Sequence, residues 1–421
     1  MYVLYHAFGF AGIYTFVLVM TAGIAILLFH NLLQEKNHLF LAFGVSMLAI
    51  FYARDVFVAR NQLFSFFIFE GEIFSLIGLL ERGKKRYFWV LIALAFLLVL
   101  VHDTLYILFL VMLLPYLVDI LFHKLFNMEK SHKFKTSQWK NAKYLMVLVL
   151  LAIPIGFCTP VFATTYTNLI HCMDGISTKF ISELQPIHPL ENVSLLTITF
   201  LAIGLFGFTK TKFYLKDILF VFGLILFAMM AGRNIFFLYL IGSIYLTNML
   251  AECMHTYMGE ETVKHCFESM EKSLLVVVVV FYFTSIIAIK NFSYQLVKSY
   301  VNPLYYPEGA TEWILENMDV KSMRIWNHFN WGSYLEFKGI KVFVDSRSGM
   351  YTEQENKGCT VLNDWYLIDT DQVGYEEIFE KYQITHILVR KSERLNHHLI
   401  EDEHYHAIYE DDTFILYEKR V

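Results

Sequence analysis

The stretch Ser273–Lys290, SLLVVVVVFYFTSIIAIK, is the last long apolar run of the chain and stops abruptly at Lys290. Similar apolar runs precede it, whereas residues 291–421 have the composition of a water-soluble protein. Lys and Arg number 21 against 17 Asp and Glu up to Lys290, and 13 against 22 after it. We therefore predict two domains, a transmembrane helical domain at 1–290 and a soluble α/β domain at 291–421.

The part before residue 291 is predicted to cross a membrane about ten times. Hydrophobic residues make up 56% of the chain and only 7 residues are Pro, so most spans should be uninterrupted helices. The expected fold class is a polytopic α-helical membrane protein with a C-terminal α/β domain. We place the helices at 8–30, 38–52, 62–80, 87–101, 103–122, 143–163, 193–208, 216–231, 234–250 and 273–290.

Basic residues between the spans predict the orientation. Alternate loops carry 16 Lys and Arg on one side and 4 on the other. Because basic loops stay in the cytoplasm, the N-terminus and residues 291–421 are predicted to lie outside, with the protein in the cell (plasma) membrane. The first residues lack the basic start of a signal peptide, so an outside N-terminus implies either that the first helix inserts with its N-terminus first or that an upstream span is missing.

The soluble domain is predicted to alternate helices and strands. We expect helices at 307–318 and 375–382, and strands at 323–326, 334–337, 341–344, 386–390 and 414–417. Asp345 and Arg347 follow one of these strands, a position where α/β folds often carry functional groups. The alternative is a structural pair that fixes a loop.

Charged and polar residues at the predicted outer helix ends are the candidates for a site, because a charge beside a span is costly unless it has a partner or a role. Arginines there can hold a phosphate group, and carboxylates can accept a proton. The candidate catalytic residues are Asp55 and Asp103, the candidate phosphate-binding residues are Arg54, Arg60 and Arg233, and His102, Glu183 and His188 complete the set.

Simpler alternatives remain open for these residues. Arg54 and Asp55 could form an interfacial pair, His102 and Asp103 a polar turn, and Arg233 an anchor whose charge reaches the membrane surface. Two further acids, Glu70 and Glu72, lie within a predicted span and should face the interior of the bundle, as a packing device or as a polar cavity wall.

Motifs for soluble enzyme chemistry are absent from the sequence. It has no phosphate-binding glycine loop, no H-E-x-x-H and no G-x-S-x-G, and none of its 5 cysteines forms a C-x-x-C pair. No motif indicates a metal, so the cofactor is left open, with a divalent metal as one option. Nucleic acid is not an expected partner; the lipid bilayer is.

Four segments resemble the bacterial multi-spanning membrane glycosyltransferases of the GT-C fold. RNQLFS at Arg60–Ser65 is similar to their R-P-Q-x-F-S segment, and GRNI at Gly232–Ile235 to their R-H-I segment. RIWNHFNWGSYL at Arg324–Leu335 and VFVDSRSGMY at Val342–Tyr351 resemble their tail signature N-x-x-x-W-G-x-Y-L … V-F-x-D-x-R. This chain departs from the pattern at Asn61, in place of Pro, and at Asn234, in place of His.

The resemblance implies an enzyme of the hexosyltransferase type. Such proteins take a sugar from a polyprenyl-phosphate donor on the outer face and transfer it to a glycan, lipid or protein acceptor of the cell envelope. A carboxylate in their first outer loop acts as base; here Leu4–His6 resembles the end of that loop, so the helix and acidic loop before it are expected to be missing. The alternative function is a non-catalytic membrane assembly or scaffold protein, or an inactive shortened homologue.

Overall fold

The structure is a computed structural model of the 421-residue chain. It forms two compact units, which are described separately: a helical bundle built from residues 1–174 and 178–284, and a C-terminal unit built from residues 175–177 and 285–421. The structure describes residues 1–34, 38–125, 133–159, 162, 165–167, 176–271, 304–351 and 356–420.

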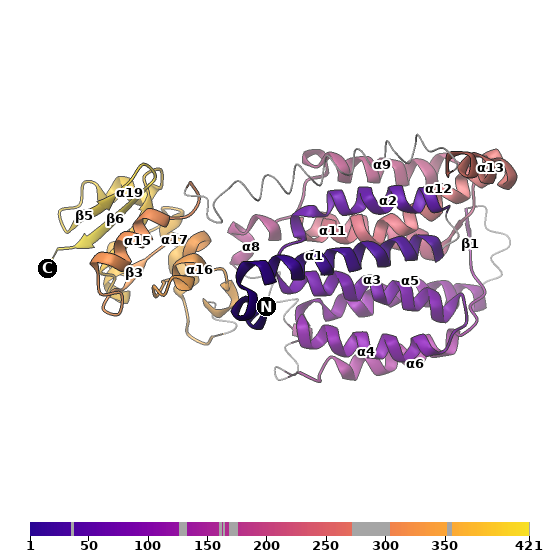
Figure 1. Cartoon of the computed structure of the whole chain (residues 1–421), viewed down its shortest axis with the longest axis horizontal. Helices are drawn as coiled ribbons and strands as arrows, with labels where there is room; N and C mark the ends of the chain where they lie inside the picture. Colours follow the sequence, from indigo (N-terminus) through magenta and orange to yellow (C-terminus); the bar gives the residue numbers. More distant parts are fainter. Residues whose placement is uncertain are drawn as a thin grey trace. The chain divides into compact units, whose positions relative to one another are not determined.

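Long antiparallel helices make up the bundle (Figure 1). The central helix α3 packs against α1 and α4, and α10 packs against α5 and α12. The main helices are α1 (Tyr2–Gln34), α2 (Leu39–Tyr52), α3 (Asn61–Leu80), α4 (Arg86–Val101), α5 (Tyr106–Leu125), α6 (Ala142–Ile155), α9 (Val193–Phe208), α10 (Leu215–Met230), α11 (Ile235–Phe237), α12 (Ser243–Met258) and α13 (Glu260–Glu271).

Within the described residues, nine of the ten predicted helices have a counterpart, and the prediction at 273–290 falls outside them. Several helices differ from the prediction in detail. Helix α1 begins at Tyr2 rather than residue 8, because Gly9 takes a positive φ of 60° inside it and lets a short helical segment join the span. Helix α6 ends at Ile155, and a π-helical segment, η7 (Leu238–Gly242), links α11 to α12 in one longer helix.

Among the described residues, four helical segments are long and apolar enough to cross a membrane: Tyr2–Gln34, Asn61–Leu80, Asp103–Leu125 and Gly232–Met258. Shorter apolar helices are Leu39–Tyr52, Arg86–Val101, Ala142–Ile155 and Val193–Phe208. Large apolar side chains on several of these helices are open on the outside of the bundle; Phe208 is 87% exposed and Trp89 70%. This exterior suits a lipid environment, so the coarse prediction of a helical membrane protein agrees with the structure, whereas the number of ten spans stays a prediction.

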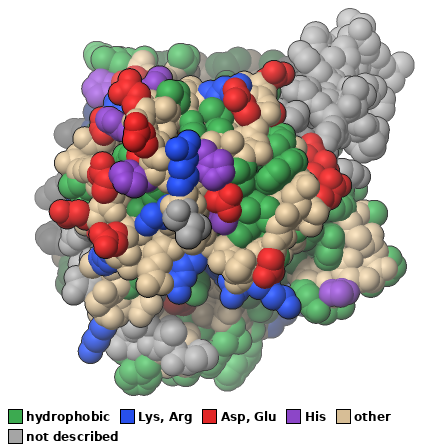
Figure 2. Space-filling view, turned by 90° about the vertical axis from the view of Figure 1, so that its left-hand side faces the viewer, with side chains coloured by type: hydrophobic (Ala, Val, Ile, Leu, Met, Phe, Trp, Pro, Cys, Tyr) green, Lys and Arg blue, Asp and Glu red, His purple; other side chains and the backbone are tan. Residues whose placement is uncertain are grey.

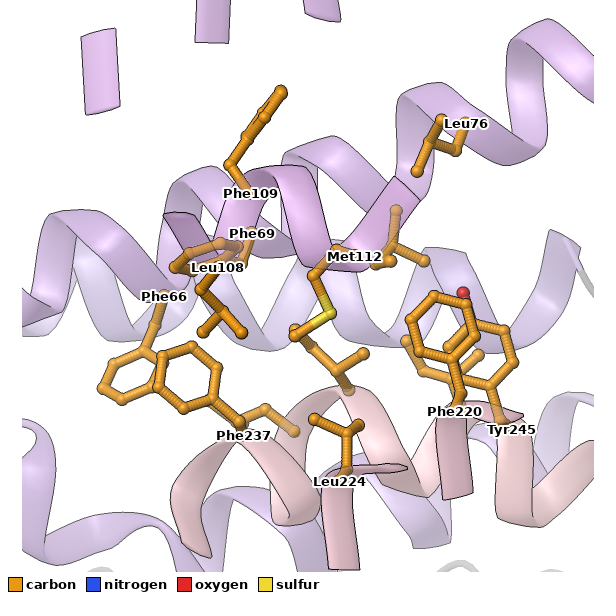
Figure 3. Close-up of a cluster of buried hydrophobic side chains, with 14 of the residues drawn as sticks. Phe66, Phe69, Leu76, Leu108, Phe109, Met112, Phe220, Leu224, Phe237 and Tyr245 are labelled. Carbon is orange, nitrogen blue, oxygen red and sulfur yellow. The ribbon is translucent and has the colours of Figure 1, made fainter. Parts of the chain in front are cut away.

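Aromatic and aliphatic side chains fill the bundle core (Figure 3). Phe66 and Phe69 of α3 meet Phe237 of α11, with ring centroids 5.0 and 5.3 Å apart. Phe220 of α10 stacks on Tyr245 of α12 at 3.9 Å. Tight aromatic contacts of this kind fix the helices against one another, and therefore fix the turns at their ends.

Antiparallel packing gathers the connecting segments at two ends of the bundle (Figure 1). We call these the Arg233 end and the Lys216 end. The Arg233 end holds η1 (Arg54–Val56), η2 (Asp103–Leu105), η6 (Gly232–Asn234) and residues 178–192, with most of α8 (Ser177–Phe180), η4 (Ser182–Leu184) and η5 (Pro189–Glu191). The Lys216 end holds residues 81–85, the parallel pair β1 (Phe134–Lys135) and β2 (Phe213–Tyr214), and α13.

A four-stranded sheet with helices makes up the C-terminal unit, as the predicted α/β class requires. The strand order is β3-β4-β6-β5, with β3 parallel to β4 and the other pairs antiparallel. Its elements are α15 (Glu308–Asn317), β3 (Ile325–Trp326), α16 (Phe329–Phe337), η8 (Ser348–Tyr351), α17 (Val361–Asp369), α18 (Glu376–Tyr382), β4 (His386–Arg390), α19 (Arg394–Leu399), β5 (Tyr405–Glu410) and β6 (Phe414–Lys419).

Two predicted strands in this unit are wrong. Residues 334–337 form the last turn of α16, because His328 caps this helix by accepting a hydrogen bond from the Asn330 backbone N–H at 3.1 Å. Residues 341–344 form no strand; the backbone N–H of Phe343 donates to the side chain of Asn327 instead of to a neighbouring strand.

Charged and histidine side chains are numerous on the face shown in Figure 2, as on a water-exposed surface.

Candidate functional site

The turn that carries Arg233 is held in place by the segment before α9. The backbone N–H of Gly232 donates to the carbonyl of Gln185 at 2.9 Å, and the N–H of Ile187 donates to the carbonyl of Met229 at 3.2 Å. Within the turn, the Asn234 side chain donates to the carbonyl of Phe227 at 3.0 Å. These bonds fix the backbone on both sides of Arg233 and so define where its guanidinium can reach.

Arg233 and His102 line the same small cavity, of about 20 Å³, together with Gln62, Phe66, Thr104, Leu105, Asn234 and Phe237. Arg233 is half-buried. Within the described residues it has no ion pair and no side-chain hydrogen bond, which is unusual for a partly desolvated cation. Among the described residues, the site therefore offers a positive charge that no carboxylate pairs with.

His102 is fixed at this cavity by Ser65 of α3, whose hydroxyl oxygen lies 2.8 Å from Nδ1 of the imidazole. Burial lowers the pKa of His102 to about 4, and the positive charge of Arg233 acts in the same direction. The imidazole is therefore neutral at physiological pH and serves as a hydrogen-bonding group beside the arginine, without adding a charge.

Arg60 and Glu183 form an ion pair at the same end, with Nη1 and Oε1 3.3 Å apart. Both side chains are more than half exposed, at 57% and 52%. Arg60 precedes α3, and the backbone of Glu183 lies beside Gly232, so the pair connects the start of α3 to the Arg233 turn. The sequence predicted both residues as site candidates but did not predict that they bind each other.

Other predicted residues of this end lie apart from the cavity. Arg54 and Asp55 face each other at 3.7 Å, Asp55 is 74% exposed, and Arg54 donates to the carbonyl of Phe51. Asp103 follows His102 in the chain, but its carboxylate caps the turn by accepting from the Thr104 N–H at 2.9 Å. His188 contributes its backbone carbonyl to the η5 turn. For Arg54 and Asp55 the geometry matches the simpler alternative, an exposed pair, whereas Asp103 lies in the chain between two residues that line the cavity, His102 and Thr104.

In the C-terminal unit, Asp345 and Arg347 form an ion pair with each other. Asp345 is fully buried and accepts from the Arg347 backbone N–H at 2.8 Å and from the Tyr351 hydroxyl at 2.8 Å, and Arg347 also pairs with Glu336 at 2.7 Å. Burial alone would raise the pKa of Asp345, but the bonds from Arg347 and Tyr351 outweigh it and hold the pKa below its ordinary value. This is the structural alternative, a pair that fixes the loop after residue 344.

The tail motif around Asn327 and Gly332 is structural as well. The Asn327 side chain donates to the carbonyl of Val344 at 2.8 Å and accepts from the Phe343 N–H at 2.8 Å. A Cβ atom on Gly332 would lie 1.9 Å from the Val344 carbonyl oxygen, so only glycine fits there. The residues that carry the family resemblance in the tail thus pack the segment 342–345 against α16.

The sequence did not predict a second polar cavity, of about 850 Å³, at the Lys216 end. Lys216 is 3% exposed and donates to Glu81 at 2.9 Å, and its ammonium lies 5.7 Å from the rings of Tyr116, Trp139 and Tyr245. The sequence feature that could have indicated this cavity is the charged pair Lys216-Asp217 in the first turn of an apolar helix. The partner, Glu81, is distant in sequence, and no local pattern identifies it.

Metal ligands do not cluster in the part of the chain that the structure describes: no group of three or more His, Cys, Asp or Glu side chains could hold an ion. Fold and site together define an α-helical protein with membrane-length spans, a C-terminal α/β unit and a cationic cavity at one bundle end. No protein-family model and no curated protein matches the sequence. The function is therefore inferred from the site and from the resemblance that the sequence segments carry.

Proposed function

We propose that this protein is a membrane glycosyltransferase that takes a sugar from a polyprenyl-phosphate donor at the Arg233 end and transfers it to an acceptor of the cell envelope. The observation that carries the proposal is Arg233, a half-buried guanidinium without a partner among the described residues. In this proposal the Arg233 end faces outward across the plasma membrane, as the distribution of basic residues predicts.

Arg233 would bind the phosphate of the donor. A guanidinium forms strong charge-assisted hydrogen bonds with phosphate oxygens, and none of the described carboxylates pairs with Arg233 in competition with such a ligand. In sugar transfer, an acceptor oxygen attacks the anomeric carbon while the bond from that carbon to the phosphate oxygen breaks. Negative charge grows on the departing phosphate, so a cation at that point stabilises the transition state more than the bound donor.

His102 and Arg60 would assist from either side. Neutral His102 adds a hydrogen-bonding ring nitrogen next to Arg233 without competing for the anion. Arg60 is exposed and tied to Glu183, so a phosphate could recruit it by exchanging that carboxylate for a phosphate oxygen. The cavity itself is small, and we place the phosphate at its mouth, with the lipid tail along the apolar exterior of the bundle.

The base for the acceptor hydroxyl is proposed to be Asp103, which follows His102 directly. It would take the proton that leaves the acceptor oxygen as the new glycosidic bond forms. Asp55 is the weaker candidate, since its carboxylate is 74% exposed and beside Arg54. We assign no step to Asp345 or Arg347, whose hydrogen bonds are taken up within the C-terminal unit.

The direct test measures binding of a polyprenyl phosphate to the purified full-length protein in lipid nanodiscs. Arg233→Gln should weaken binding roughly tenfold to a hundredfold, because a hydrogen bond to a charged group is lost. Arg54→Gln is the matched control: it removes an arginine from the same end, but an exposed one that already bonds to Phe51. Equal losses in both variants would point to general attraction of the anionic lipid and would refute the Arg233 site.

Transfer itself is tested with a labelled polyprenyl-phosphate sugar in membranes that contain this protein alone. Asp103→Asn should abolish transfer while leaving binding of the lipid phosphate intact, because a base is needed for the reaction and not for binding. Binding without any transfer by the unmodified protein would instead support the alternative, a membrane assembly or scaffold protein. The small cavity volume, about 20 Å³, is the observation that favours this alternative.

A further inference from the structure

Two glutamates on α3 are separated by a single residue in the sequence but lie in different environments. Glu70 and Glu72 are both 0% exposed. The Asn31 side chain of α1 donates to Glu70 Oε2 at 2.7 Å, whereas neither carboxyl oxygen of Glu72 has a hydrogen-bond partner among the described residues. Positions two apart on a helix point about 200° apart, so the two carboxyls face different neighbours.

An ionised Glu72 would be unstable in this environment. A buried carboxylate needs a cation or several hydrogen-bond donors, and none of the described residues supplies either to Glu72. A neutral carboxylic acid removes the charge but still leaves its polar atoms without partners. Stability alone would be better served by an apolar side chain, so the retained acid indicates a role.

The titratable groups on the neighbouring elements do not offset this burial. His30 of α1 bonds to the carbonyl of Ile26, and Tyr239 of η7 bonds to Ser194. Arg86 lies at the start of α4 and stacks on Tyr87. Glu72 and Tyr106, the first residue of α5, are close enough to interact electrostatically.

We propose that Glu72 is a proton-binding site in the interior of the bundle, which holds a proton in the packed state and releases it only when the helices around it admit water. The chemistry is a simple equilibrium, in which the carboxylic acid loses its proton to water and leaves a carboxylate. Because the carboxylate must be hydrated, deprotonation and local opening of α3 and α5 become one coupled step.

Tyr106 provides the route for this proton toward the Arg233 end. It is fully buried, it donates to the carbonyl of Ala152 at 2.6 Å, and its ring lies 6.5 Å from that of the partly exposed Tyr166. Tyr106 also interacts electrostatically with Cys158, whose side chain is exposed. Tyr106 therefore interacts both with the buried acid and with groups that reach the surface.

Infrared difference spectroscopy of the full-length protein in lipid membranes tests the proposal without any substrate. At neutral pH the unmodified protein should show the carbonyl stretch of a protonated carboxylic acid that lacks a hydrogen bond, and this band should shift on transfer to D₂O. Glu72→Gln should remove it. Glu70→Gln is the matched control on the same helix; any acid band of Glu70 lies at lower frequency because Asn31 bonds to it, so the unbonded band should persist.

Three results would overturn the proposal: no acid band at neutral pH, a band that survives Glu72→Gln, or a band that never shifts in D₂O or under alkaline conditions. A band that never shifts would mean that Glu72 never exchanges its proton and has a purely structural role. The variant Tyr106→Phe tests the proton route independently of the proton-binding site. The carbonyl band of Glu72 should remain in this variant, and its shift in D₂O should become several-fold slower. An unchanged rate would exclude Tyr106 as the path.

Discussion

At the scale of single residues, Gly332 shows how strongly one position can constrain the C-terminal unit. The Cβ of an alanine there would meet the backbone of Val344, which cannot move away as a flexible side chain can. We expect Gly332→Ala to lower the free energy of unfolding of this unit by about 1–3 kcal/mol. Tryptophan fluorescence during denaturant unfolding would report it, because Trp331 and Trp365 are buried nearby.

Gly374→Ala is the control for this substitution. Its new Cβ would meet only the carboxylate end of Glu376, which can swing aside, so the midpoint of unfolding should hardly change. If both variants unfold alike, the contact between Gly332 and Val344 does not constrain the unit in the way described.

Glu393 predicts how the stability of the C-terminal unit depends on pH. Burial raises the pKa of Glu393 from 4.5 to about 8, and the negative charge of Asp369 adds to this. Because the folded state holds this proton more tightly than the unfolded state, the free energy of unfolding should fall as pH rises from about 4.5 to about 8. Glu393→Gln should flatten this part of the pH profile, and an unchanged profile in the variant would contradict the assignment.

At the scale of elements, the helices of the bundle were predictable because each buries or exposes a long apolar run. The strands could not be predicted at positions where a single side chain decides the local structure. Residues 334–337 read as a strand by composition, but the cap at His328 starts a helix that includes them. The bond from Phe343 to Asn327 likewise comes from outside the segment, and no pattern within 341–344 reveals it.

Helix α9 depends on its N-cap residue, Asn192. The side chain of Asn192 accepts from the Leu195 N–H at 3.0 Å and from the Ser194 hydroxyl at 2.6 Å, and the Ser194 hydroxyl lies 2.5 Å from that of Tyr239. Asn192→Ala should therefore destabilise the bundle by about 1 kcal/mol, and Asn192→Asp should retain most of the stability. Thermal unfolding in detergent would measure both; equal midpoints for the two variants would exclude a capping role.

At the scale of the whole molecule, the candidate site could be predicted only in part. Residues at helix ends on one side were expected to meet because antiparallel spans return there, and His102 and Arg233 do. The pairing of Arg60 with Glu183, and of Lys216 with Glu81, joins residues far apart in sequence. Such pairings depend on which helices pack together, and charge patterns along a chain do not specify that.

Two native cysteines test the orientation of the bundle. Cys158 follows α6 at the Arg233 end and Cys266 lies on α13 at the Lys216 end, and both are exposed. If the Arg233 end faces outward, a membrane-impermeant thiol reagent applied to intact cells should label Cys158 and spare Cys266. Cys158→Ser and Cys266→Ser identify each signal, and permeabilised cells should show both. Labelling of Cys266 alone would reverse the orientation.

The π-helical segment η7 has a consequence for the history of the Arg233 turn. A π-helical turn is equivalent to an α-helix that has gained one residue, and here it lies between Arg233 and α12. Deleting one residue from Leu238–Gly242 would let the segment relax to a regular helix and rotate Arg233 by about 100° relative to α12. A single inserted codon is therefore enough to change the direction in which Arg233 leaves the helix relative to α12.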